Sequence, residues 1–401
     1  MSFQFGIDRL LGSSRLLAEL QHKNVALIAH PASVTSGNQH TLDALLESGC
    51  SVIRAFGPQH GMRGDKQDNM IESSDYMDPV HQIPVISLYG EHRFPTPDML
   101  KDLDVILYDL QDIGCRIYTY ISTLKYFVEA CGKAGVELWV LDRPNPAGRP
   151  VDGLFLQAGE ESFVGCDTLP TRHGLTVGEL ADWFNAKMTA RANLRIIDMQ
   201  DYLPDEGPGL GWPSGLRPWI NPSPNAASQN MSRCFSGTVL LEGTTLSEGR
   251  GTSIPLEVIG APDFPLEDVL SHLRAFVPEW LGSAYLRPCF FEPTFHKYQG
   301  SMCKGIQIHT DYAGYDHGAF KPFRLIAGLL KSLRHCVPEY DLWRHHEYEY
   351  ESGRIPIDVI NGGPRLRNWV DDEAQSYADL ETELRDVENR WTLERQGILR
   401  Y

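Results

Sequence analysis

The sequence predicts an α/β protein with a doubly wound parallel sheet and a smaller C-terminal α+β domain. Three observations lead to this prediction. Short apolar runs alternate with amphipathic helical patterns in the first half, polar turns follow the runs, and the pattern changes after a segment rich in proline, glycine and tryptophan at residues 204–224. Strands that alternate with helices pair in parallel through right-handed crossovers, so we expect a Rossmann-like sheet.

The elements of this sheet follow one another at short intervals. Five apolar or β-branched runs are expected to form strands, at residues 25–29, 52–56, 85–88, 105–108 and 138–141. Helical patterns lie between several of them, at residues 41–47, 97–103 and 124–134.

The second half is expected to be a separate domain, because 401 residues exceed one ordinary core. Its pattern is richer in strands: we expect strands at residues 237–241 and 305–309 and helices at residues 323–333 and 377–389. We place the boundary near residue 227. This gives a Rossmann-like catalytic domain at residues 1–227 and an auxiliary α+β domain at residues 228–401 that completes the cleft.

Composition excludes several classes of partner. The formal net charge of −17 disfavours nucleic acid and anionic membranes, which need a basic face. The N-terminus lacks the pattern of a signal peptide, and no apolar stretch is long enough to cross a bilayer. Eight cysteines without a Cys-x-x-Cys pair indicate buried, reduced thiols. We therefore expect a cytoplasmic enzyme, and the negative charge does not exclude an anionic small substrate. The oligomeric state is not predicted.

Polar turns follow all five predicted strands, and ligands of an open parallel sheet bind outside the carboxyl ends of its strands. The most informative turn is Gly-Pro-Gln-His-Gly-Met-Arg-Gly at residues 57–64, where Gln59, His60 and Arg63 stand between turn-forming residues. The later turns begin at residues 109 and 142. We expect the site at this edge of the sheet.

Cofactor chemistry has little support in the sequence. The first strand is followed by Ala-His-Pro-Ala at residues 29–32, whereas a dinucleotide site needs Gly-x-Gly-x-x-Gly at this point. No Walker motif, metal-ligand spacing or nucleophile elbow is present. No cofactor and no metal are expected.

Glycoside hydrolysis needs carboxylates, and the sheet edge offers them. Glu72, Asp109 and Asp112 are the candidates for catalysis, although helix capping or loop hydrogen bonding explains the two aspartates about as well. Arg63 and Arg116 could bind a carboxylate bidentately or pair with nearby aspartates.

Two segments of the second half are candidates for ligand contact. The loop at residues 241–252 contains Glu248 and Arg250 between glycines and hydroxyl residues, with almost no apolar side chain to bury. The segment at residues 293–300, with His296, alternates aromatic and polar residues, as in a rim that stacks on sugars or in an edge strand.

Six segments in this order resemble the exo-acting β-N-acetylmuramidases of the NamZ family, formerly a domain of unknown function. They are residues 57–64, 108–120, 141–146, 222–225, 242–252 and 293–300. The resemblance implies release of N-acetylmuramic acid from the non-reducing end of peptidoglycan fragments, with a muropeptide or peptidoglycan oligosaccharide as ligand. It implies substrate contacts from motif residues, among them Gln111, Asn145 and Asn225, and an arginine (Arg63, Arg116 or Arg250) for the lactyl carboxylate.

One position departs from the family pattern. Where members have Pro-Glu-His-Gly, with the expected catalytic acid, this chain has Gln59. An amide cannot deliver a proton at neutral pH. Three explanations remain open: Glu72 has taken the role, Asp109 or Asp112 provides the acid while Gln59 binds the sugar, or the protein binds a muramyl ligand without hydrolysing it.

Overall fold

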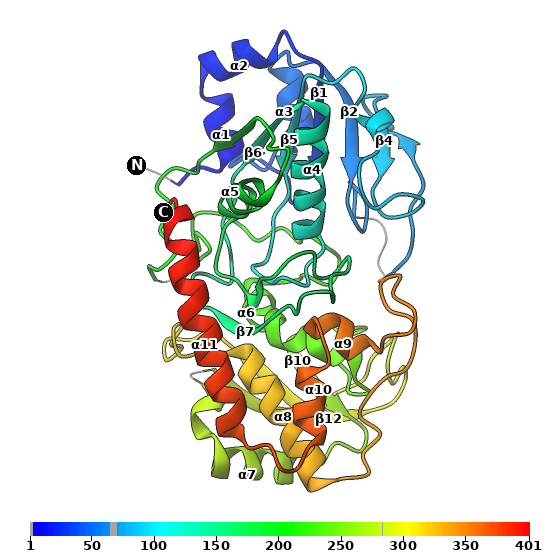
Figure 1. Ribbon diagram of the computed structural model, residues 1–401, viewed down its shortest axis with the longest axis vertical. Helices are drawn as coiled ribbons and strands as arrows, with labels where there is room; N and C mark the ends of the chain where they lie inside the picture. Colours follow the sequence, from blue (N-terminus) through cyan, green and yellow to red (C-terminus); the bar gives the residue numbers. More distant parts are fainter. Residues whose placement is uncertain (1–2, 65–69, 208, 283) are drawn as a thin grey trace.

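The computed structural model describes residues 3–64, 70–207, 209–282 and 284–401. The N-terminal sheet and its helices form the upper half of the view in Figure 1, and most C-terminal elements form the lower half. This arrangement confirms the predicted α/β class with a smaller C-terminal region.

A seven-stranded sheet forms the centre of the upper half. The strand order is β3-β4-β2-β1-β5-β6-β9. Strand β3 is antiparallel to β4, and the other pairs are parallel. The bounds are β1 (Val25–Ala29), β2 (Val52–Gly57), β3 (Tyr76–Met77), β4 (Pro84–Ser87), β5 (Val105–Asp109), β6 (Glu137–Leu141) and β9 (Leu194–Ile197). The six parallel strands have the order of a Rossmann sheet, with the topological switch point between β1 and β5.

Alternating side chains of the strands divide the core between the two faces of the sheet. Ile28 and Ile106 pack with residues of α4 (Tyr120–Ala134) and α5 (Val177–Lys187). Their neighbours Leu27 and Leu107 pack on the other face. That face is covered by α1 (Gly6–Leu11), α2 (Ser14–Leu20) and α3 (Thr41–Glu47).

The helix predicted at residues 97–103 is shorter than expected. Only the 3₁₀ turn η1 (Pro97–Leu100) forms there. Lys101 is extended and Asp102 has a φ of 64°, so the backbone leaves the helical region directly after one turn.

The C-terminal half is mostly helical around a small antiparallel sheet of order β10-β12-β11. Its strands are β10 (Val258–Ala261), β11 (Tyr285–Phe291) and β12 (Cys303–His309). Its helices are α6 (Gln229–Thr238), η2 (Val239–Gly243), α7 (Leu266–Phe276), η3 (Pro278–Leu281), α8 (Pro322–Cys336), α9 (Pro356–Asn361), α10 (Arg365–Asp371), α11 (Tyr377–Arg395) and η4 (Gln396–Ile398).

The strand predicted at residues 237–241 is wrong, because these residues belong to α6 and η2. The side chain of Ser228 caps α6 by accepting a hydrogen bond from the backbone N–H of Met231. The apolar run is buried on every side, and such a run fits a buried strand and a buried helix equally well.

The two halves share one continuous core. Strand β7 (Asp152–Phe155), which pairs with β8 (Pro170–Arg172), packs against α11 and α8 of the C-terminal half. Helix α11 then runs back along the side of the molecule to the sheet (Figure 1), where the Tyr401 hydroxyl donates to Asp142 Oδ2 at 2.6 Å. The boundary near residue 227 therefore stays a prediction.

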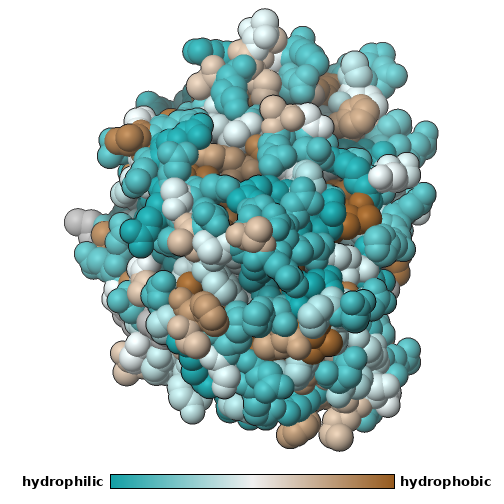
Figure 2. Space-filling view, turned by 60° about the horizontal axis from the view of Figure 1, so that its bottom comes forward, coloured by the Kyte–Doolittle hydropathy of each residue, from teal (hydrophilic) through white to brown (hydrophobic). Residues whose placement is uncertain are grey.

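The surface gives little sign of a large hydrophobic contact area on the face in Figure 2. That face is mostly hydrophilic, with hydrophobic residues in small separate groups. In the part of the chain that the structure describes, none of the helices has the length and apolar character needed to cross a membrane.

Candidate active site

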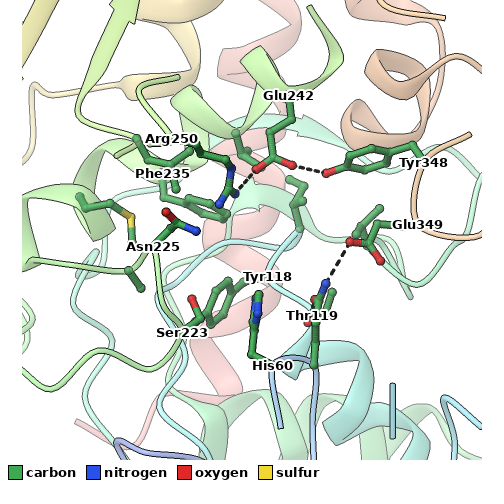
Figure 3. A pocket seen from close by; sticks show the side chains of 17 residues that line it. His60, Tyr118, Thr119, Ser223, Asn225, Phe235, Glu242, Arg250, Tyr348 and Glu349 are labelled. Atoms are coloured by element: carbon green, nitrogen blue, oxygen red, sulfur yellow. Dashed lines mark hydrogen bonds and ion pairs between the residues drawn. The ribbon is translucent and has the colours of Figure 1, made fainter. Parts of the chain in front are cut away.

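A pocket with polar and apolar side chains lies where the carboxyl ends of β2 and β5 meet the C-terminal half. Seventeen side chains line it (Figure 3). Gln59 and His60 come from the turn after β2, and Tyr118 and Thr119 come from the segment that leads into α4. The pocket has a cavity volume of about 50 Å³, and the wider empty space of about 490 Å³ around it includes open solvent.

Glu242, near the end of η2, is held by two donors from other segments. Arg250 Nη2 donates to its Oε1 at 2.6 Å, and the Tyr348 hydroxyl donates to its Oε2 at 2.6 Å. Figure 3 shows the glutamate between these two side chains. A guanidinium and a phenol are partners that stabilise an ionised carboxylate.

Glu349 is the second carboxyl group of the pocket. Gln59 Nε2 donates to its Oε1 at 3.0 Å, and the Tyr89 hydroxyl donates to its Oε2 at 2.8 Å. Burial, with a smaller effect of the charge of Glu242, raises the pKa of Glu349 to about 7, against the lowering effect of its two hydrogen bonds and of the charge of Arg250. This carboxyl group therefore holds a proton near neutral pH.

A tight turn carries Glu349 into the pocket. The backbone N–H of Glu351 donates to the carbonyl of Tyr348 at 2.9 Å, and the two residues between them, Glu349 and Tyr350, have φ of 46° and 68°. Two positive φ values at the central positions are typical of a type I′ turn, which favours asparagine and glycine. Each non-glycine residue in this region costs about 1–3 kcal/mol, which the surroundings must offset.

Contacts of Tyr350 provide part of that offset. Its ring lies under the guanidinium of Arg93, 3.7 Å from the ring centroid, and packs edge-on against Tyr89. Its hydroxyl donates to Glu72 Oε1 at 3.1 Å. The turn is thus attached to the N-terminal half by both of its central side chains.

Four of the predicted substrate-binding residues line this pocket: Gln59, His60, Asn225 and Arg250. Gln59 accepts a hydrogen bond from the Thr119 hydroxyl at 2.8 Å through Oε1. His60 has a φ of 70°, a strained conformation of the kind that clusters at functional sites.

The three predicted catalytic carboxylates are not among the residues that line it. Glu72 is exposed and supports Tyr350. Asp109 is fully buried and accepts hydrogen bonds from Arg143 Nε at 2.6 Å and from the Thr41 hydroxyl at 2.5 Å.

Asp112 is buried in the loop after β5. Its Oδ2 accepts from the backbone N–H of Gly114 at 2.6 Å and lies 3.6 Å from His173 Nε2. Gln111 Nε2 donates to the carbonyl of Pro144 at 2.7 Å. Asn145 donates from Nδ2 to the carbonyl of Leu175 at 3.0 Å. These contacts connect the loops after the strands to one another.

The other two predicted arginines also have structural partners. Arg63 is half exposed and forms an ion pair with Asp78. Arg116 is fully buried, and its Nη2 donates to the carbonyl of Asn361 at 2.9 Å. Burial lowers the pKa of Arg116 to about 10. Of the three arginines considered for a lactyl group, Arg250 is the one that lines the pocket.

Glu248 and His296 are not among the lining residues, but Glu248 contacts Arg250, which lines the pocket. Lys297 Nζ contacts Glu248 Oε2 at 2.8 Å, and Arg250 Nε and His296 Nδ1 are 3.3 and 3.5 Å from its Oε1. Burial opposes ionisation of Glu248, but the cations Lys297 and Arg250 and the ring of His296 lower its pKa to about 2. Glu248 therefore acts as a buried anion that fixes Arg250.

Sequence reasoning missed both glutamates of the pocket as site residues. Glu242 opens a segment that it had singled out, and the cluster of acidic and aromatic residues around Glu349 was a further signal. Among the described residues, no group of three histidine, cysteine or acidic side chains is placed to hold a metal ion.

The switch point of the sheet is filled by a side chain. His30 follows β1, and the backbone N–H of Gln111, which follows β5, donates to its Nε2 at 2.9 Å. Its ring packs edge-on against Tyr120, and burial lowers its pKa to about 3. A neutral imidazole thus occupies the place at which a Rossmann fold binds the pyrophosphate.

Comparison with known proteins agrees with this architecture. Models described as the N-terminal and C-terminal domains of the exo-β-N-acetylmuramidase NamZ match residues 25–230 and 233–401. The chain is 37% identical over 341 residues to the peptidoglycan β-N-acetylmuramidase NamZ of Bacillus subtilis. The matched region covers 84% of this chain and 78% of that protein.

Two crystal structures of DUF1343 family proteins from Bacteroides fragilis are similar to this chain over 100% of its length and 99% of theirs. One has a TM-score of 0.82 at 27% identity. The other has a TM-score of 0.74 at 24% identity and shows the shared fold. Taken with the two domain matches, these similarities show that the chain belongs to the NamZ family of exo-β-N-acetylmuramidases.

Proposed function

We propose that this protein is a glycosidase that releases N-acetylmuramic acid from the non-reducing end of peptidoglycan-derived oligosaccharides. One observation carries the proposal: the two family matches span almost the whole chain, and segments from both of them build one pocket that contains two glutamates. Glycoside hydrolysis requires such a carboxyl pair in most families.

The lining of the pocket suits a muramyl sugar. Gln59, His60 and Asn225 offer polar groups for the hydroxyl and acetamido substituents, as the resemblance implied. Arg250 is proposed to attract the lactyl carboxylate, with Glu242 and Glu248 fixing the direction of its guanidinium.

Gln59 supports a second candidate function, a protein that binds a muramyl ligand without turnover. The position carries an amide where the family has its expected acid, and an amide donates hydrogen bonds but no proton. In this alternative the pocket recognises the sugar and releases it unchanged.

A role in the recycling of wall fragments in the cytoplasm is part of the proposal. All eight cysteines are unpaired thiols, and seven of them are buried. Unpaired thiols are usual in a reducing compartment. Localisation of a tagged chain in fractionated cells would test this part independently of the enzymology.

Hydrolysis of MurNAc-β-1,4-GlcNAc by the wild type and by Gln59→Glu tests the function. Activity of the wild type supports the glycosidase and ends the binding-only alternative. Activity in Gln59→Glu alone, with tight binding of the disaccharide by the wild type, supports the binding protein. Neither hydrolysis nor binding in either form overturns both candidates.

A further inference from the structure

A carboxyl group, that of Glu349, lies within hydrogen-bond distance of Gln59, the position at which the family has its expected acid. Gln59 Nε2 donates to Glu349 Oε1 at 3.0 Å, while its own Oε1 accepts from the Thr119 hydroxyl at 2.8 Å. Because Thr119 occupies the oxygen of the amide, its NH₂ group faces the glutamate. Gln59 therefore cannot deliver a proton itself, but its NH₂ group holds a carboxyl group that can.

We propose that Glu349, carried by the turn at residues 348–351, is the general acid of this pocket and that Gln59 positions it. This inference rests on the proposed glycosidase function. It differs from the family pattern in placing the acid on the C-terminal half of the chain, 290 positions from Gln59.

The surroundings of Glu349 favour its protonated form. It is 5% exposed, and no ion pair involves it in the described part of the chain. Its two hydrogen-bond partners, Gln59 and Tyr89, are neutral. The titratable and charged groups that share its surroundings are His60, Tyr89, Glu242, Arg250 and Tyr348. A buried carboxyl group without a cation of its own keeps its proton at a pH where an exposed one has lost it.

The backbone conformation of this turn also indicates a functional role. Glu349 and Tyr350 both have positive φ, although neither is glycine or asparagine. Such strain persists only where the surroundings enforce it, and it concentrates at active sites. Here Arg93 and Glu72 hold the ring and hydroxyl of Tyr350, so the turn presents the carboxyl group of Glu349 in one orientation.

The two glutamates of the pocket account for both proton transfers of the reaction. Glu349 gives its proton to the glycosidic oxygen as the bond from this oxygen to C1 of the muramyl sugar breaks, and the leaving sugar departs as an alcohol. Water adds its hydroxyl group to C1 and passes its remaining proton to the carboxylate of Glu242. Exchange with solvent then returns a proton to Glu349 and removes one from Glu242.

The test compares two substrates that differ in their need for an acid. MurNAc-β-1,4-GlcNAc has a poor leaving group, whereas 2,4-dinitrophenyl β-MurNAc has one that departs without protonation. Glu349→Gln should lower kcat/KM for the disaccharide by about 10²–10⁴-fold and for the dinitrophenyl glycoside by less than about tenfold. Glu347→Gln, the same change at an exposed position of the same segment, should leave both rates unchanged.

The outcomes separate this inference from the function itself. If the wild type cleaves neither substrate, the proposed function fails and the inference falls with it. If the wild type cleaves both and Glu349→Gln lowers both equally, the function stands and the assignment of the acid is overturned.

A second pair of measurements guards against a folding defect. Calorimetric binding of free N-acetylmuramic acid should be retained within about fivefold in Glu349→Gln, because the amide can keep the contacts with Gln59 and Tyr89. The wild type should lose activity on the disaccharide as pH rises above about 7, and this loss should be absent with the dinitrophenyl glycoside. A basic limb that is identical for the two substrates would contradict the assignment.

Discussion

Removal of the Glu349 carboxyl group should change how the stability of the fold depends on pH. The pKa of Glu349 rises from an ordinary value of 4.5 to about 7 in the folded protein, chiefly through burial. The folded state therefore holds a proton between these two values that the unfolded chain releases. The stability from this group is fully present below pH 4.5 and is lost as pH rises through 7.

The size of the effect follows from the two pKa values. A difference of one pKa unit corresponds to about 1.4 kcal/mol, so the change from 4.5 to about 7 corresponds to about 3 kcal/mol between pH 4 and pH 8. Glu349→Gln has no such proton. Relative to the wild type, its free energy of unfolding should increase by about 3 kcal/mol over this range.

Urea unfolding followed by tryptophan fluorescence at pH 4, 5, 6, 7 and 8 measures this difference. Other groups, such as Asp142 with its own pKa of about 7, titrate in both proteins and cancel. Glu347→Gln, the same change at an exposed position of the same segment, is the matched control. A difference between Glu349→Gln and the wild type that stays constant from pH 4 to pH 8 would refute the reasoning, since it would mean that Glu349 ionises alike in both states.

Three further predictions test the contacts around the pocket. Gln59→Ala removes a hydrogen bond that lowers the pKa of Glu349, so the basic limb of the pH–rate profile should move to higher pH while kcat falls by about tenfold; an unmoved limb would contradict the contact. Lys297→Met leaves Glu248 partly uncompensated and should destabilise the fold by about 3–5 kcal/mol near neutral pH, measured by denaturant unfolding. Because Glu248 has a lowered pKa of about 2, that loss should shrink as pH falls from 4.5 toward 2, and a pH-independent loss would contradict it. Glu72→Gln removes an exposed partner of the turn and should change kcat/KM by less than about fivefold, whereas a loss of a hundredfold or more would identify Glu72 as the acid.

The N-terminal sheet could be predicted from local patterns. Each predicted strand is a short apolar run closed by turn residues, and a parallel sheet brings the ends of these runs to one edge without further information. Gln59 and His60 were found in this way. The same reasoning placed Asp109 and Asp112 at the edge, but it could not show that Arg143 donates to Asp109 or that the backbone N–H of Gly114 donates to Asp112.

The predictions failed where structure depends on distant partners. The run at residues 237–241 is helical, but its side chains are buried on all sides. Its sequence therefore lacks the periodicity that distinguishes a helix from a strand, and the prediction of a strand was wrong. Glu349 was missed because its contacts with Gln59 and Tyr89 span 290 and 260 positions. A single sequence carries no record of such a pairing.

The distance between Gln59 and Glu349 along the chain has a consequence for how this site is assembled. The side chain that positions the acid comes from the turn after β2, the acid comes from the C-terminal half, and Tyr350 joins the same turn to Arg93. Residues 25–230 contain neither Glu242 nor Glu349, so this part of the chain alone has no carboxyl pair in the pocket. The strain at Glu349 and Tyr350 is offset only while the halves are packed together. Catalysis in this protein therefore depends on the packing between its halves as directly as on the residues that contact the sugar.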